Sequence, residues 1–493
     1  MTKKIVACVL AAALIIVLIG VSTAEFRDDD ALYVDDVGTK SQIDEQKIYD
    51  ELFDPNSVVR IEIDISNNEL AKIQNDYEHY KSNGSKSPIY RKADSVTFII
   101  NGKKYVIEEV GMRMKGNETR TNFYNDILGV YNLVNFRLSF NETFDDADYY
   151  IVDSKKWNSD KERSLRKKRT FATLDDIEIK WNSSLDNTYV RNTYVSDMFK
   201  AYDVPAQNCR LASVRAGTYE LGVYKIFEPV DDIFIQRYFS EQDSGGDLYK
   251  SNWAYGQPAN CTLDNTYGVP DKEKGVFYNF ELKTNKTDPQ HVYLKRFLRV
   301  INDENLTKNK LEEVLDVDSF LRFCALNYLM GNQDDLRNNY NNYYLYFRPS
   351  DGKAVFIPYD CERCLGCVYN WDPTGSAMTE VSPYSDMAEG AQLEQVNNLI
   401  NFTVGSNGNY KEEYTEYLRE IASSKWMTES NYRSYYDTAQ KNYEEYADYA
   451  YLYLSANGRN LDFSMEGGEG YNDNMAVPEF MRKIKNTMYK YVS

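Results

Sequence analysis

The stretch GNQDDLRNNYNNYYLYFRPSDGKAVFIPYDCERCLGC, residues 331–367, places acidic and amide side chains ahead of two β-rich runs and three cysteines behind them. The runs are NYYLYFR and KAVFIPY, and residues 349–352 between them are all of types that favour turns. The stretch therefore predicts a β-hairpin. Antiparallel pairing would bring Asn342, just before the first strand, to within about 5 Å of Asp360, just after the second.

The loop that leads into this end carries Asp334, Asp335, Asn338 and Asn339. Carboxylate and amide oxygens gathered at one point suit hard cations such as Mg²⁺ or Mn²⁺. Protein kinases use the same order: a proton-accepting aspartate, a metal-binding asparagine, a hairpin and a metal-binding aspartate. The HRD and DFG strings of those enzymes are absent. The residues alone leave two interpretations, a phosphotransfer site and an Asx-rich turn beside a hairpin.

Composition excludes several other classes of site. The chain has only two histidines, His79 and His291, so a Ser/His/Asp hydrolase, a Cys/His protease or a His-rich zinc site would depend on one of them. The formal net charge of −19 argues against nucleic acid or an anionic membrane as the main partner. The same charge is compatible with a basic protein partner.

The first residues have the pattern of an export signal. A short basic start, an apolar run over residues 5–20 and small residues before Glu25 predict a signal peptide over residues 1–24. An uncleaved membrane anchor is the alternative. Residues 25–54 are acidic and poor in apolar side chains, which predicts a tether.

The remainder divides by its secondary-structure signals. Residues 55–300 are strand-rich, with Asn101-Gly102 between two β-rich runs as a strong hairpin signal. Residues 301–493 have helical patterns, including a helix that Asp316 caps and Gly331 ends. We therefore expect an α+β fold with strands first and helices second.

Six cysteines follow the signal segment, an even number that permits disulfides in an exported protein. Cys361, Cys364 and Cys367 form a CxxCxxC run, but a closed zinc or iron–sulfur site needs a fourth ligand. No cysteine follows Cys367, and neither histidine is near in sequence. We expect local disulfides or free thiols here, without iron or zinc.

Further blocks resemble the spore-coat CotH-type kinases, a family of atypical, secreted or surface-associated relatives of the protein kinase fold. The residues that carry the resemblance are VGMRMKGNETR (110–120), NFRLSF (135–140), LGVYKIFEPVDDIFIQRYF (221–239), GDLYKSN (246–252) and the hairpin stretch, with its Asn-Tyr-Tyr-Leu-Tyr strand. They occur in the family's order across residues 58–370. The resemblance implies an atypical protein-kinase-like bilobal fold, with a strand-rich N-terminal lobe and a helix-rich C-terminal lobe.

The resemblance also implies a function. Such a protein would transfer the γ-phosphoryl of ATP, with Mg²⁺ or Mn²⁺, to Ser or Thr of an exported, Lys/Arg- and Ser-rich protein. It would be secreted, at the cell surface or in the spore coat, and attached to a membrane only through an uncleaved N-terminal anchor. The alternative is a non-catalytic surface or spore-coat protein that keeps the fold.

Carried over position by position, the resemblance implies roles for nine residues. Asp335 is the first candidate for the catalytic base and Asp334 the second. The implied metal ligands are Asn342, Asp360 and Glu362. The implied contacts to ATP are Lys115, Lys225 and Lys250, with Glu228 as their partner or a metal ligand; a surface charge is the alternative for each.

Two departures from the family pattern bear on activity. Glu362 stands where the family has a second aspartate, and its extra methylene moves the carboxylate by more than about an ångström where Mg²⁺ tolerates little error. Tyr359 stands in place of a tryptophan, and the loop from Asp335 to Asn342 is longer than is common in the family. Weak activity is therefore compatible with the sequence.

Overall fold

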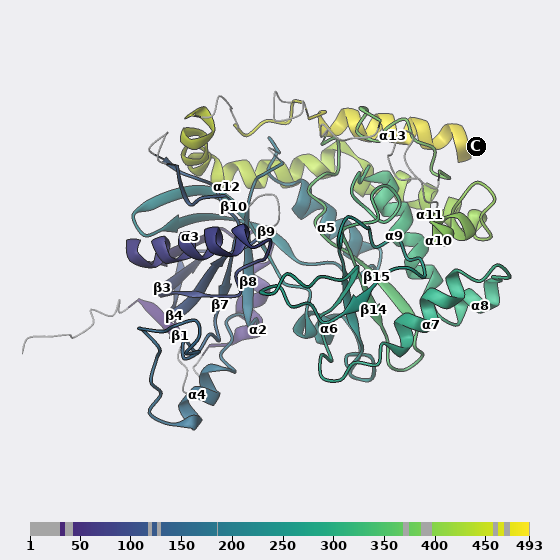
Figure 1. Ribbon diagram of the computed structural model, residues 1–493. Coiled ribbons are helices and arrows are strands. Elements are labelled where there is room, and N and C mark those ends of the chain that lie inside the picture. The colour runs from purple at the N-terminus through teal and green to yellow at the C-terminus, as the bar shows by residue number, and fades with distance from the viewer. Residues whose placement is uncertain are drawn as a thin grey trace, which may run out of the picture.

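The computed structural model describes residues 30–34, 43–116, 121–125, 130–184, 186–367, 374–385, 397–456, 462–467 and 474–492. The fold is mixed α+β, with an eight-stranded sheet, a five-stranded sheet and a two-stranded one (Figure 1). The expected signal peptide or anchor, residues 1–24, lies outside the described residues. Among the helices of the described part, none has the length and apolar character to cross a membrane.

The eight-stranded sheet has the order β1-β4-β3-β2-β9-β10-β8-β7. Its strands are β1 (Ala31–Val34), β2 (Val59–Asp64), β3 (Arg91–Ile100), β4 (Lys103–Met114), β7 (Phe136–Ser139), β8 (Asp176–Trp181), β9 (Cys209–Ala216) and β10 (Tyr219–Phe227). β7 pairs with both β8 and β4, so seven of these strands close into a ring, with β1 added beside β4. The predicted Asn101-Gly102 hairpin between β3 and β4 is confirmed, and both turn residues have positive φ, 51° and 83°.

Part of the expected acidic tether is folded, so that prediction is wrong for two segments. β1 pairs in parallel with β4, and residues 45–52 form helix α2 (Glu45–Leu52), which Asp44 caps. The helix buries Ile48, Tyr49 and Leu52, which are spaced to share one face. Three apolar side chains at helical spacing outweigh the acidic composition of the segment.

The five-stranded sheet contains the predicted hairpin. Its order is β12-β13-β11-β14-β15, from β11 (Leu248–Ser251), β12 (Tyr267–Gly268), β13 (Phe280–Leu282), β14 (Tyr343–Phe347) and β15 (Ala354–Pro358). Tyr343 pairs with Pro358, and the backbone N–H of Tyr359 donates to the carbonyl of Asn342 at 3.0 Å. The hairpin prediction is confirmed. The smallest sheet pairs β5 (Tyr124–Asn125) with β6 (Val130–Tyr131).

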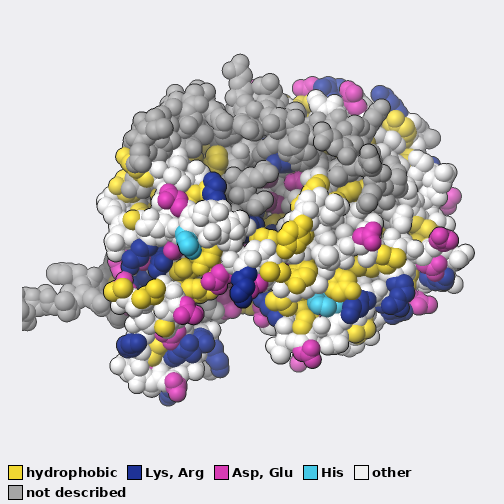
Figure 2. Space-filling view, viewed as in Figure 1, with side chains coloured by type: hydrophobic (Ala, Val, Ile, Leu, Met, Phe, Trp, Pro, Cys, Tyr) yellow, Lys and Arg dark blue, Asp and Glu magenta, His cyan; other side chains and the backbone are white. Residues whose placement is uncertain are grey.

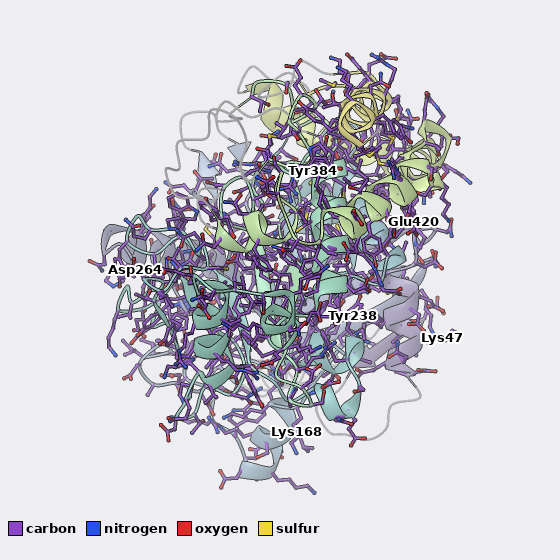
Figure 3. The ribbon with its side chains drawn as sticks, turned by 90° about the vertical axis from the view of Figure 1, so that its right-hand side faces the viewer. Lys47, Lys168, Tyr238, Asp264, Tyr384 and Glu420 are labelled. Carbon is purple, nitrogen blue, oxygen red and sulfur yellow. The ribbon has the colours of Figure 1, made fainter. Side chains whose placement is uncertain are left out.

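Helices surround both large sheets. They are α3 (Asn67–Ser82), α4 (Asp160–Arg166), α5 (Arg191–Ala201), α6 (Asp232–Tyr238), α7 (Val292–Ile301), α8 (Lys308–Glu312), α9 (Val317–Leu329), α10 (Asn398–Thr403), α11 (Lys411–Ser423), α12 (Glu429–Ala456) and α13 (Val477–Val492). Figure 1 shows the eight-stranded sheet with α3 at the left, the hairpin with α9 at the right, and α12 running across the top between them. The view of Figure 3, turned by 90°, has Tyr384 in the upper half and Lys168, which follows α4, in the lowest part of the molecule.

Helix α9 delivers the chain to the loop before the hairpin. The side chain of Asp316 accepts from the backbone N–H of Ser319 at 3.1 Å, which is the predicted N-cap. Gly331 has a φ of 60°, and a Cβ there would lie 2.7 Å from the ring of Phe480. Both the conformation and the close approach require glycine, so the helix ends where the sequence predicts.

Candidate active site

The open end of the hairpin is held in an uncommon backbone conformation. Tyr340, Asn342 and Asp360 all have positive φ, between 51° and 52°. Non-glycine residues in this region cost on the order of 1 kcal/mol or more each, and they persist where surrounding contacts fix them, often at active sites. Asparagine and aspartate tolerate this conformation better than most residues, which agrees with their occurrence here.

Asp334 lies at this end. Its Oδ2 accepts from the Asn342 amide at 2.8 Å, and its Oδ1 accepts from the amides of Asn339 at 2.6 Å and Asn341 at 3.3 Å. Burial raises the pKa of Asp334 to about 6, and the nearby Asp360 carboxylate acts in the same direction. Asp334, Asn342 and Asp360 therefore belong to one group, as the hairpin geometry predicts.

Asp335 points into the interior instead. Its Oδ1 accepts from the backbone N–H groups of Arg337 at 3.0 Å and Asn338 at 2.8 Å, which closes the turn. Only 5% of its surface is exposed, and it lines a small internal cavity together with Tyr328 and Met378. Burial raises the pKa of Asp335 to about 6 as well. Of the two adjacent aspartates, the structure brings Asp334 and not Asp335 to Asn342.

Asp360 and Glu362 follow the second strand. Asp360 Oδ1 lies 3.0 Å from the ammonium of Lys180, and Glu362 Oε2 accepts from the hydroxyl of Ser183 at 3.0 Å. Burial alone would raise the pKa of Asp360, but Lys180 lowers it below its usual range. Burial and the Asp360 carboxylate together raise the pKa of Glu362. Two carboxylates with opposed pKa directions thus share one small region.

Three lysines gather around the ring of Tyr359. Their ammonium nitrogens lie 4.1 Å (Lys250), 4.9 Å (Lys180) and 5.6 Å (Lys115) from the ring centroid, within the range of cation–π attraction. Lys115 also donates to the Tyr359 hydroxyl at 3.0 Å and forms an ion pair with Glu178. Tyr359, which stands in place of the family's tryptophan, therefore contacts all three lysines and holds them together.

These lysines are crowded, and their pKa values reflect it. The pKa of Lys115 is lowered to about 7, chiefly by burial, with Lys180 and Lys250 acting in the same direction and Glu178 opposing them. Burial also lowers the pKa of Lys250 to about 7. Burial disfavours the charged form of Lys180 too, but Asp360 and Glu178 raise its pKa above the usual range. A bound anion would relieve the repulsion among the three ammonium groups.

Of the two remaining predicted residues, Lys225 lies beside this cluster, opposite Lys180 on the paired strands, whereas Glu228 lies apart. The charge of Lys225 opposes the rise in the pKa of Glu362 that burial causes. Lys225 is buried and donates to the amide oxygens of Asn182 and Asn192 at 3.0 Å each. Glu228 is fully buried and pairs with Arg237 at 2.8 Å, and burial raises its pKa. The Glu228 carboxylate pairs with Arg237 and with none of the three lysines around Tyr359, so its implied role as a partner or metal ligand stays a prediction. Glu178 is the carboxylate in contact with Lys115.

Sequence reasoning missed Glu178 and Lys180. Both lie on β8, whose sequence DIEIKW resembles an ordinary alternating strand. The available signal was a pair of opposite charges two positions apart, which places both side chains on the same face. The structure shows that both residues are buried, which is uncommon for a charged strand pair and marks them as functional candidates. The sequence does not reveal this burial.

The donor set at the hairpin end fits a hard divalent cation. Asp334, Asp360 and Glu362 supply carboxylate oxygens, and the Asn342 amide, whose nitrogen donates to Asp334, presents its carbonyl oxygen. Asp360 raises the pKa of both other carboxylates, so added positive charge would stabilise all three. Within the described ranges no trio of His, Cys, Asp or Glu is already arranged to hold a metal.

The cysteines near the site are thiols. Of the two expected forms, local disulfides or free thiols, Cys361, Cys364 and Cys367 take the second, and Cys364 and Cys367 are buried. Burial raises the pKa of the Cys367 thiol to about 11, which disfavours the thiolate that a metal would need. That they bind neither iron nor zinc stays a prediction.

Comparison with known proteins decides the family. Residues 136–455, more than half of the chain, match the family described as CotH kinase protein. The chain belongs to the CotH kinase family. The match includes every site candidate of this CotH kinase family member except Lys115, which precedes it.

The comparisons beyond the family are sparse. No curated protein matches this CotH kinase family member. Among solved structures, the crystal structure of the proinflammatory kinase CtkA of Helicobacter pylori is similar at 11% sequence identity, over 57% of this chain and 91% of that one, with a TM-score of 0.25. The family assignment therefore rests on the match over residues 136–455.

Proposed function

We propose that this protein is a protein kinase that transfers the γ-phosphoryl of ATP to Ser or Thr of an exported protein. One observation carries the proposal: the carboxylates at the hairpin end meet the lysines around Tyr359, joined by the 3.0 Å contact of Asp360 with Lys180 of the eight-stranded sheet. Phosphoryl transfer needs this combination, cations for the phosphates and carboxylates for the metal. In this proposal the strand-rich and helix-rich parts are the two lobes of a kinase-like fold.

The residues divide the work in the following way. Asp360, Glu362 and Asn342 would hold Mg²⁺ or Mn²⁺, which neutralises charge on the phosphates. Lys115 and Lys250 bind phosphate oxygens, and Tyr359 positions both ammonium groups. Lys180 pairs with Asp360 and fixes the orientation of that carboxylate.

Asp334 is the proposed proton acceptor. The substrate oxygen attacks the γ-phosphorus, the bond to the leaving ADP oxygen breaks, and the hydroxyl proton passes to Asp334. A pKa of about 6 keeps this carboxylate ionised at pH 7 while making it a stronger base than an ordinary aspartate. The amides of Asn339 and Asn342 fix its orientation. Asp335, which closes the interior turn, has no part in the transfer.

Export is part of the proposal. Its support is the signal-like pattern of residues 1–24, and a membrane anchor is the alternative fate of that segment. Secretion, display at the cell surface and incorporation into a spore coat are all compatible with that pattern. An exported kinase needs ATP outside the cytoplasm or must act before translocation.

A non-catalytic binding protein is the second candidate, and Glu362 favours it. The longer side chain changes the cation position where octahedral Mg²⁺ needs short, regular bonds of about 2.1 Å. Mn²⁺ and Mg²⁺ should therefore be compared rather than used interchangeably. A protein of this kind would bind nucleotide or a partner without turnover.

The deciding experiment measures nucleotide binding and transfer on one preparation. We expect ATP to bind by calorimetry with Mg²⁺ or Mn²⁺ and more weakly in EDTA, and radiolabel from γ-labelled ATP to appear on protein Ser or Thr. Absence of nucleotide binding with either metal would exclude the kinase. Metal-dependent binding without transfer to any protein would instead support the non-catalytic candidate.

A further inference from the structure

The connection between β11 and β13, residues 252–279, exposes an unusual number of apolar side chains. Trp253, Tyr255, Leu263 and Val269 are 38%, 74%, 63% and 37% exposed. Figure 2 shows hydrophobic side chains running diagonally across the middle of the face that it presents, with Lys and Arg side chains beside them. Exposed apolar groups concentrated on one segment indicate an interaction surface.

This segment is attached directly to the loop that holds Asp334. The indole Nε1 of Trp253 donates to the carbonyl of Asn339 at 3.3 Å, and the Asn339 amide donates to Asp334 at 2.6 Å. An exposed indole thus lies two hydrogen bonds from the proposed proton acceptor. A side chain of the substrate next to the acceptor hydroxyl would reach it.

The far end of the segment is fixed on the other side of the site. Glu273 accepts from the hydroxyls of Tyr80, on α3, at 3.3 Å and Tyr149 at 3.1 Å. The backbone N–H of Lys86 donates to the carbonyl of Lys272 at 3.1 Å. Because both ends are anchored, the apolar side chains are presented in fixed positions, which lowers the entropy lost on binding.

The segment carries charges of both signs, among them Asp264, Asp271 and Glu273, but the side chains that act on Lys272 are mostly basic. Lys283 and Lys272 lie 3.1 Å and 3.8 Å from the same Glu281 carboxylate, and the Lys272 side chain is 43% exposed. Asn252 also donates to Glu281, which links the lysines to the residue before Trp253. Burial lowers the pKa of Lys272 to about 7, with Lys283 acting in the same direction and Glu281 opposing both. Two ammonium groups that share one carboxylate leave excess positive charge for an anion.

We propose that the 252–279 connection docks the polypeptide substrate, with an apolar residue against Trp253 and Tyr255 and an anionic group against Lys272. The inference rests on the proposed kinase function. It reverses the expectation of a basic substrate, because nearby charges and not the net charge of −19 determine the field at a site. The anion is a carboxylate or a phosphoryl group of the substrate.

A polypeptide fits this surface better than a small molecule. Tryptophan and tyrosine are the side chains that most often dominate protein–protein contacts, where they accept an apolar residue and are surrounded by polar groups. One border of the surface is the Asp334 loop, to which a Ser or Thr hydroxyl has to come. The acceptor residue would therefore lie next to the apolar contact, so the test peptides carry Ser beside Phe.

The test measures peptide binding by fluorescence anisotropy, in low salt with ADP and Mn²⁺. One labelled peptide carries Ser between Phe and three Glu residues. Three others replace Phe by Gly, the Glu residues by Lys, or one Glu by phosphoserine. We expect the acidic Phe peptide to bind at least about tenfold more tightly than the basic one. The phosphoserine peptide distinguishes a phosphoryl-directed surface from a carboxylate-directed one.

Variants assign the contacts. Trp253→Ala is expected to lower the affinity for the Phe peptide by about tenfold and the affinity for the Gly peptide hardly at all. Lys272→Glu should lower the affinity for the acidic peptides by about tenfold and should not lower the affinity for the basic one. Lys168→Glu is the matched control, since Lys168 is exposed and lies in the lowest part of the molecule in Figure 3. If Trp253→Ala unfolds, Trp253→Phe keeps an aromatic ring and removes only the bond to Asn339.

The outcomes separate this inference from the kinase function. If the basic peptide binds as tightly as the acidic one, or if Trp253→Ala and Lys272→Glu change no affinity, the docking surface is overturned even when transfer occurs. If the acidic peptide binds with the expected dependence on both residues but receives no phosphoryl group, the surface stands and the kinase function fails. Loss of ATP affinity in Trp253→Ala would assign the segment to the nucleotide site and also overturn the inference.

Discussion

The two sides of the candidate site are built in different ways. The carboxylate side comes from residues 334–362, a single stretch in which a hairpin folds both ends together. The lysine side comes from Lys115 at the end of β4, Lys180 on β8 and Lys250 on β11, which meet around Tyr359. One side depends on local pairing, the other on bringing strands of both large sheets together. The lysine side therefore depends on more long-range contacts than the carboxylate side.

The largest expected effect tests the contact between the two sides. Asp360→Asn removes the charge that pairs with Lys180 and should lower transfer by about a hundredfold or more, with the fold retained. Asp351→Asn is a matched control at the other end of the same hairpin, where Asp351 pairs with Arg348. Initial rates and melting temperatures of both variants check this. Equal rates for Asp360→Asn and the wild type would contradict a role in transfer for the contact between the two sides.

The next prediction separates neighbouring aspartates on the carboxylate side. Asp334→Asn should lower transfer by roughly 10²–10⁴-fold while ATP binding persists, because the proton acceptor is lost. Asp335→Asn keeps an oxygen that can accept from Arg337 and Asn338, so transfer should stay within about threefold. The rates and ATP affinities of the two variants, measured side by side, check the assignment. The reverse order of effects would return the catalytic role to Asp335.

A smaller effect is expected from pH, which acts on both sides at once. kcat/KM should rise as Asp334 ionises through its pKa of about 6, and fall as Lys115 and Lys250 lose their protons above pKa values of about 7. These groups give a narrow bell-shaped profile. Replacing both lysines by arginine should move the alkaline limb to higher pH, since arginine stays charged, whereas Lys115→Arg alone should make it shallower. A profile that is flat from pH 5 to 9 would contradict both assignments.

The smallest expected effect concerns the departure at the metal ligands. Glu362→Asp restores the family's residue and should leave transfer unchanged or raise it a few-fold, most visibly with Mg²⁺. The ratio of rates with Mg²⁺ and Mn²⁺, measured before and after the change, is the sensitive quantity. A loss of more than tenfold would indicate that the contact of Glu362 with Ser183 is needed for the site.

The difference between the two sides also explains what the sequence could predict. Turn residues and strand patterns predict the hairpin, and with it the proximity of Asn342 and Asp360, because those signals are local. The pairing of β7 with β4 joins segments without any local signal, so the closed ring was not predicted. Glu178 and Lys180 acquire their role only through that closure. The sequence therefore predicted the carboxylate side well and the lysine side only in part.

The ranking of Asp334 and Asp335 as candidates for the catalytic base illustrates a second limit of prediction from sequence. Adjacent residues of the same type carry equal signals, and only the burial of Asp335 by Arg337 and its neighbours distinguishes them. The prediction of an acidic tether was wrong for a related reason. Composition described residues 25–54 as a whole, whereas the spacing of Ile48, Tyr49 and Leu52 decided the fold of α2.

Helix α12 has a consequence for how the chain is made. The hydroxyl of Tyr443 accepts from the backbone N–H of Val59 at 2.9 Å and donates to the carbonyl of Leu211 at 3.0 Å, both in the eight-stranded sheet. Two buried backbone groups of early strands thus obtain their hydrogen-bond partner from a residue synthesised almost four hundred positions after Val59. The eight-stranded sheet therefore lacks these two backbone hydrogen bonds during synthesis until this late helix has been made.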